Sequence, residues 1–185
     1  SDVCSSDLPD RTVDDVRVLM SMDSITQTNP VVRALFALRS AMVMSPDREG
    51  IFDVMLGIVR RGLGGTAGNG KQYISWIHHQ DFLDAIDFIV EQELDGAINL
   101  AAPNPLPNRE FMKVFRETWG TSFGLPATEW MLEVGAVFMK TETELLLKSR
   151  RVVPGILLKE GFTFAYPEWT EAAANLCEQW RAENR

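Results

Sequence analysis

Apolar runs that suit buried strands alternate with amphipathic helical patterns along the middle of the chain. The first run, ALRSAMVMS, is stopped by Pro46 and is typical of a strand buried on both faces of a parallel sheet. The expected strands cover residues 37–45, 72–78 and 96–102. Apolar residues at helical spacing follow each of them, over residues 52–59, 82–90 and 111–119. This order predicts α/β units built on a parallel sheet.

The ends of these elements carry further predictions. Asp81 and Asn108 are expected to cap the second and third helices, and Gly62 is expected to end the first. The loop GLGGTA at residues 62–67 formally matches the dinucleotide pattern G-x-G-x-x-A. A dinucleotide loop follows a strand and opens a helix, whereas this loop follows an expected helix and leads into an expected strand. We therefore interpret it as a helix end and a turn.

The character of the chain changes after Gly120. Residues 130–151 are expected to be helical, Pro154, Gly161 and Pro167 interrupt the next stretch, and a last helix is expected over residues 169–183. The predicted fold is the C-terminal portion of a parallel sheet, residues 31–102, followed by a small and mostly helical C-terminal domain, residues 103–185. Residues 9–30 have no clear pattern, and their origin stays open.

Composition narrows the classes of function. The net charge of −8 and the pI near 4.8 argue against nucleic acid and anionic membranes as partners. There is no apolar run long enough for a membrane span and no visible secretory signal. Two cysteines, Cys4 and Cys177, suit a reducing compartment, so we expect a cytoplasmic location.

Patterns of catalytic and metal-binding residues are not evident. His78 and His79 are adjacent and are expected to point to opposite sides of a strand, so no metal site is predicted. The sequence offers neither a Ser-His-Asp nor a Cys-His pattern, and no catalytic residue is proposed.

The first eight residues, SDVCSSDL, have a separate interpretation. They can be encoded by TCA GAC GTG TGC TCT TCC GAT CT, which resembles a common sequencing adapter. We interpret them as a translated adapter, and a polar native N-terminus is the alternative.

Four motifs occur in a characteristic order: WIHHQD at residues 76–81, NLAAPNP at 99–105, RRVVP at 150–154 and GFTF at 161–164. Together they resemble the C-terminal part of the epimerase-type, extended short-chain dehydrogenases, which end in a small domain of unassigned role. The resemblance implies a Rossmann-like sheet and a parent that is an NAD(P)-dependent epimerase or oxidoreductase. Its substrate would be a nucleotide sugar or a similar polar molecule.

The resemblance also implies which residues serve the site. Gln72, Trp76, His78, Asn104 and Arg151 would border the substrate. Met44, Ser45 and Pro46 would lie beside the nicotinamide of NAD or NADP in the parent.

Several of these residues have a structural alternative. His78 could instead hold Trp76 and the Asp81 cap in place, and Asn104 could be a turn residue before Pro105. Gln72 could face solvent, and Arg151 could interact with a helix dipole. Arg39 is interpreted as an ion-pairing or snorkelling residue rather than a ligand contact.

The family's Ser or Thr, its Tyr-x-x-x-Lys and its dinucleotide loop have no match here. The chain alone is therefore expected to be an inactive fragment that binds no cofactor. One alternative is a non-catalytic module for binding a ligand or a protein, and another is a fragment that does not fold stably. The strand at residues 37–45 would lack its family neighbours, which predicts self-association through an exposed sheet edge.

Overall fold

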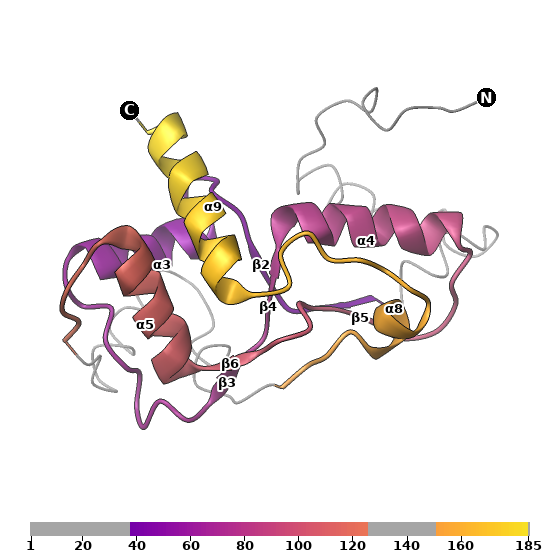
Figure 1. The fold of residues 1–185 in the computed structure, drawn as a ribbon, viewed down its shortest axis with the longest axis horizontal. Coiled ribbons are helices and arrows are strands. Elements are labelled where there is room, and N and C mark those ends of the chain that lie inside the picture. The colour runs from indigo at the N-terminus through magenta and orange to yellow at the C-terminus, as the bar shows by residue number, and fades with distance from the viewer. Residues whose placement is uncertain (1–37, 126–150, 185) are drawn as a thin grey trace.

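The computed structural model describes residues 38–125 and 151–184 (Figure 1). The predictions for residues 1–8, 9–30 and 31–37, and for most of the helix at 130–151, lie outside the described residues. The described helices are α3 (Ile51–Arg60), α4 (His79–Glu91), α5 (Asn108–Trp119), α8 (Gly155–Lys159) and α9 (Trp169–Glu183). They accompany short strands, which confirms the predicted mixed α/β fold. In the described ranges, no helix has the length and apolar character needed to cross a membrane.

The segment at residues 38–44 changes its neighbouring strand at Ala41. Its first half, β1 (Leu38–Ser40), runs parallel to β5 (Ile98–Leu100). Its second half, β2 (Met42–Met44), runs parallel to β4 (Trp76–His78). The Ala41 amide donates to the Leu100 carbonyl at 2.9 Å, whereas the next amide, that of Met42, donates to Ser75 at 3.2 Å. The sheet therefore divides at this point.

This division corrects two sequence predictions. The expected single strand at 37–45 is two three-residue strands, and Arg39 and Ser40 are exposed rather than buried. The expected strand at 72–78 is also two strands, because β3 (Tyr73–Ile74) pairs antiparallel with β6 (Leu106–Pro107). Only the second part, β4, joins the parallel pairing. Local sequence patterns do not show with which strand each part of these segments pairs.

The ends of the helices confirm one prediction and correct two. Gly62 has a φ of +73°, and the amides of Gly62 and Leu63 close the end of α3 on the carbonyls of Val59 and Ile58. The capping predictions for Asp81 and Asn108 are wrong, because each residue lies inside its helix. The Asn108 side chain instead accepts a hydrogen bond from the Ala67 amide at 2.9 Å.

Two apolar clusters form the core, and both contain residues from the two predicted units. In the first, the Trp169 ring of α9 stacks on Phe111 of α5 at 4.0 Å and meets Trp76 of β4 edge-on at 5.0 Å. In the second, Leu157 of α8 and Phe164 pack with residues of α4 and β5. The sheet portion and the C-terminal portion therefore share one interior.

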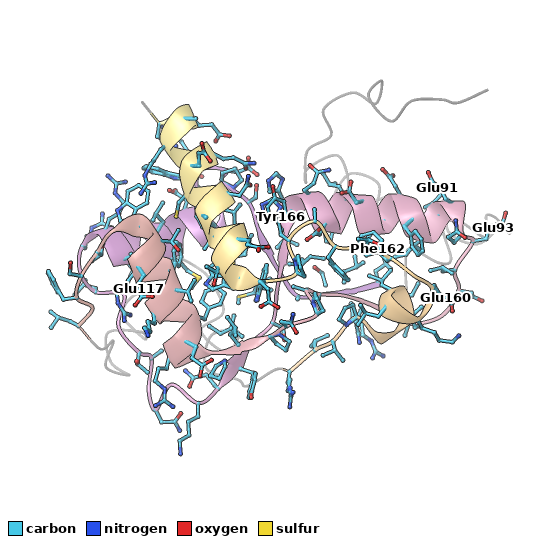
Figure 2. All side chains as sticks on the ribbon, viewed as in Figure 1. Glu91, Glu93, Glu117, Glu160, Phe162 and Tyr166 are labelled. Carbon is cyan, nitrogen blue, oxygen red and sulfur yellow. The ribbon has the colours of Figure 1, made fainter. Side chains whose placement is uncertain are left out.

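The Asp81 side chain connects these portions by polar contacts. It is fully buried in the first turn of α4, and its two oxygens accept hydrogen bonds from the amides of Ala165 at 2.7 Å and Tyr166 at 3.0 Å. Figure 2 shows Tyr166 beside the start of α4 and next to α9. Burial raises the pKa of Asp81, and the two amide bonds act in the opposite direction. Asp81 thus fixes the turn that precedes α9.

The substitution Asp81→Asn should destabilise the protein by about 1–3 kcal/mol, because an amide keeps one acceptor and turns an N–H donor toward a buried backbone amide. The measurement is the free energy of unfolding from denaturant titration. Asp84→Asn is the matched control, since Asp84 is exposed on the same helix and accepts a hydrogen bond from the Gln80 side chain. Its effect should stay within about 0.5 kcal/mol. Equal values for the two variants would contradict the role given to Asp81.

Candidate functional site

A cleft of about 720 Å³ opens where the sheet divides at Ala41. Its described lining comes from four places in the chain, residues 39–42, 73–75, 99 and 151–153. It borders the end of β1 and the amino ends of β2 and β4, where neighbouring strands diverge. The volume suits a small molecule.

One wall of the cleft is a strap formed by residues 151–153. The Val152 amide donates to the Ser75 hydroxyl at 2.9 Å, and the Asn99 side-chain amide donates to the Val153 carbonyl at 3.3 Å. The guanidinium of Arg151 lies over the ring of Tyr73, with 5.2 Å between its central carbon and the ring centroid. The strap is therefore attached to the sheet by side chains of β5 and of the residue that precedes β4.

The lining formed by β1 carries a second arginine. Arg39 of β1 is in register with Asn99 of β5, so both side chains project from the same face of the sheet. Among the described residues, neither Arg39 nor Arg151 has a carboxylate partner, and the described lining contains no Asp or Glu. The interpretation of Arg39 as an ion-pairing residue finds no support in the part of the chain that the structure describes.

Of the five predicted substrate residues, Arg151 lines this cleft and the others lie elsewhere. The Gln72 side chain donates to the Ala67 carbonyl at 2.8 Å and so holds the glycine loop. Trp76 is completely buried in the first core cluster. Asn104 is exposed, and its side-chain amide donates to Glu168 at 2.6 Å. The structure therefore does not gather the five residues at one surface.

His78 is held by hydrogen bonds at both ring nitrogens and by contacts with two neighbouring rings. Its Nδ1 accepts from the Gln80 amide at 3.1 Å, which makes His78 the cap of α4. The proton then belongs on Nε2, which donates to Asn175 of α9 at 3.1 Å. The ring also stacks on Tyr166 at 4.0 Å. Burial and the neighbouring His79 lower the pKa of His78 to about 3, so the ring is neutral at pH 7.

The two adjacent histidines lie together, which corrects the expectation that they point apart. Their ring centroids are 4.5 Å apart, because the strand ends at His78 and the helix begins at His79. His79 contacts Gln179 at 3.2 Å between Nε2 and Oε1, one turn along α9 from the partner of His78. Both rings therefore hold α9 against the start of α4.

The three predicted cofactor residues lie at the end of β2 and directly after it. Met44 and Pro46 are buried, and the hydroxyl of Ser45 donates to Asp47 at 2.5 Å. Met44 is in register with His78, so residues 44–46 and His78 share the carboxyl edge of the β2–β4 pair. This edge lies at the other end of β2 from Met42, which borders the cleft.

Sequence reasoning missed Arg39, Ser75 and Asn99 as residues of one cleft. Asn99 lies within a recognised motif, but its position opposite Arg39 depends on the pairing of β1 with β5. Ser75 is marked only by its place at a break between two strands. No local sequence pattern indicates that Asn99 pairs with Arg39 or that Ser75 borders the cleft.

Acid should destabilise the protein through His78. A pKa below the ordinary value of 6.5 means that the unfolded chain binds a proton that the folded chain excludes, so stability falls as the pH drops below 6.5. The loss between pH 6.5 and 4.5 should be at most about 2–3 kcal/mol. His79, whose pKa is also lowered, acts in the same direction, whereas the raised pKa of Asp81 acts in the opposite one.

The variant His78→Asn separates this contribution, because asparagine can cap the helix and does not titrate in this range. Denaturant unfolding at several pH values should show a shallower acid slope for the variant than for the unaltered protein. Parallel slopes would mean that His78 is not the titrating group.

Comparison with known proteins shows which proteins this chain is similar to. Residues 127–176 match a family model described as a domain of unknown function, DUF1731. An epimerase family protein of Mycobacterium bovis is 32% identical over 159 residues, which cover 83% of this chain and 51% of that protein. Human epimerase family protein SDR39U1 is 30% identical over 132 residues, covering 71% of this chain and 44% of the human protein. The chain thus spans about half the length of the curated relatives it matches.

Solved structures agree with these relatives. The crystal structure of human SDR39U1 with NADPH superposes with a TM-score of 0.69 at 30% identity, covering 76% of this chain and 47% of that chain. A nucleoside-diphosphate sugar epimerase from Corynebacterium glutamicum superposes with a TM-score of 0.54 at 27% identity, covering 76% of this chain and 25% of that one. The chain is therefore similar to epimerase family proteins over most of its own length and over about half of theirs.

Proposed function

We propose that this chain supplies the substrate side of an NAD(P)-dependent epimerase or oxidoreductase that acts on a nucleotide sugar or a similar polar substrate. The observation that carries the proposal is the fold likeness to the human relative that was solved with NADPH. The cleft supports it, because its volume of about 720 Å³ suits a small molecule and Arg151 belongs to its lining. In this proposal Arg151 contacts the substrate, while Gln72, Trp76, His78 and Asn104 hold the surrounding structure.

The described residues do not fit the pyrophosphate of a dinucleotide. The glycine loop at 62–67 follows α3 and leads toward β3, so it opens no helix. Gly64 serves chain packing, since a Cβ there would lie 2.7 Å from the Val59 side chain. We propose that residues 44–46 border the nicotinamide in a longer protein. There, other residues would bind the cofactor, which accepts or donates a hydride, and would supply the family's Tyr and Lys.

The 185-residue chain should therefore not bind NADH or NADPH with low-micromolar affinity, because it lacks the strand, glycine loop and helix that hold the pyrophosphate. Isothermal titration of the chain with each nucleotide is the measurement. Human SDR39U1, the relative solved with NADPH, is the positive control. Tight saturable binding by the chain alone would contradict its proposed inactivity.

A second candidate function is a non-catalytic ligand-binding module located in the cytoplasm. It is favoured by the cleft, which is formed within the described residues and needs no nucleotide. Ligand binding that persists in the absence of NAD(P)H, with no turnover in any longer protein, would favour this candidate.

We also propose self-association through the edge of β1 that faces away from β5. Among the described strands β1 pairs with β5 alone, and an unpaired strand edge offers backbone donors and acceptors to a second chain. Light scattering should then find dimers or larger species whose proportion rises with protein concentration. A monomer at high concentration would argue against the exposed edge.

A further inference from the structure

We propose that the cleft binds an oxyanion, a phosphate or carboxylate group, between Arg39 and Arg151. The proposal deepens the proposed function by giving the charge of the ligand, and it rests on that function in treating the cleft as the substrate site. It requires no bound nucleotide.

The first argument is the charge of the walls. Within the described lining, Arg39 and Arg151 are the charged residues, and neither has a carboxylate partner among the residues described. The chain as a whole carries a net charge of −8, so the cleft is a local exception to an acidic protein. Two guanidinium groups without a described carboxylate partner, lining one cleft, attract an anion and repel a cation.

The second argument is the orientation of Arg151. The ring of Tyr73 covers one face of the guanidinium, with 5.2 Å between the centroid and the central carbon. A stacked guanidinium keeps its N–H donors in its own plane, where they can bind two oxygens of a phosphate or carboxylate. The ring contact therefore orients these donors and leaves them available.

The third argument is that the backbone on both sides is held before any ligand arrives. Ser75 and Asn99 bind the second and third residues of the strap, through the Val152 amide and the Val153 carbonyl. Asn99 is also the register partner of Arg39, so one residue of β5 contacts the strap and lies beside Arg39. A site whose supports are already ordered loses less conformational entropy on binding.

The test uses inorganic pyrophosphate as the probe, titrated into the 185-residue chain at low ionic strength. Arg39→Gln and Arg151→Gln should each weaken binding by about 10- to 100-fold, the usual effect of losing hydrogen bonds to a charged group. Arg109→Gln is the matched control, because Arg109 is exposed in the first turn of α5 and lies outside the cleft. It makes the same change of charge and should leave the affinity within about twofold. Melting curves of the variants check that each is folded.

Malonate replaces pyrophosphate in a second titration. Tighter binding of pyrophosphate identifies a phosphate site, and tighter binding of malonate identifies a carboxylate site. Either result supports the proposal if both arginine substitutions weaken the binding. Binding that survives the double substitution, or the absence of saturable binding for both anions, overturns it.

Chemical protection of the two arginines tests the proposal on the unaltered chain. Phenylglyoxal modifies accessible arginines, and peptide mass spectrometry reports each site. Pyrophosphate should protect Arg39 and Arg151 by about tenfold while Arg109 reacts at its usual rate. Equal protection at the three positions would indicate non-specific screening and would overturn the proposal.

Failure here is distinguishable from failure of the proposed function. NADPH binding and turnover are measured on a longer family member. Their absence, with arginine-dependent anion binding intact, would count against the oxidoreductase alone.

Discussion

The attachment of the last helix to the sheet depends on the Asp81 carboxylate. Asp81 accepts hydrogen bonds from the amides of Ala165 and Tyr166, which lie 84 and 85 residues further along the chain. These bonds place the turn from which α9 begins. The helix then brings Trp169 into the first core cluster and Asn175 to the ring of His78. A buried carboxylate without these amides would carry a large desolvation cost, so the contact and the fold require each other.

The same C-terminal stretch is tied to the sheet a second time, at the strap. Side chains of Ser75 and Asn99 hold residues 152 and 153, and Asp81 holds residues 165 and 166. Between these ties, α8 packs Leu157 into the second core cluster. The cleft exists because the strap lies against a sheet that has already divided at Ala41. The shape of the cleft therefore follows from the bonds that Ser75 and Asn99 make to the strap and from the change of strand partner at Ala41.

Local sequence patterns predict most of the helices but few of the contacts between residues that are distant in sequence. Apolar spacing located α3, α4, α5 and α9, and the last of these has the predicted limits, Trp169–Glu183. Gly62 was correctly expected to end a helix, because a left-handed residue there needs no distant partner. The prediction that Asp81 caps α4 is wrong for the opposite reason. A capping aspartate and an aspartate that accepts bonds from a distant turn look the same in sequence.

The cleft had the same limitation. Arg151 was recognised through its motif, whereas Arg39 and Asn99 become neighbours only when β1 pairs with β5. The two histidines were expected to point apart because the switch from strand to helix between them was not foreseen at that residue. For Arg39 the missing information was its pairing partner, which is distant in sequence. For the histidines it was the exact residue at which the strand ends and the helix begins.

The shared interior has a consequence for inheritance. Trp169, Ala172, Ala173 and Leu176, all within the matched domain of unknown function, complete a cluster that also contains Phe52 and Phe111. Recombination that moved this domain to another protein would expose those side chains and leave a hole beside α3 and α5. Separating these residues from the sheet would therefore destabilise both parts, which favours their inheritance together.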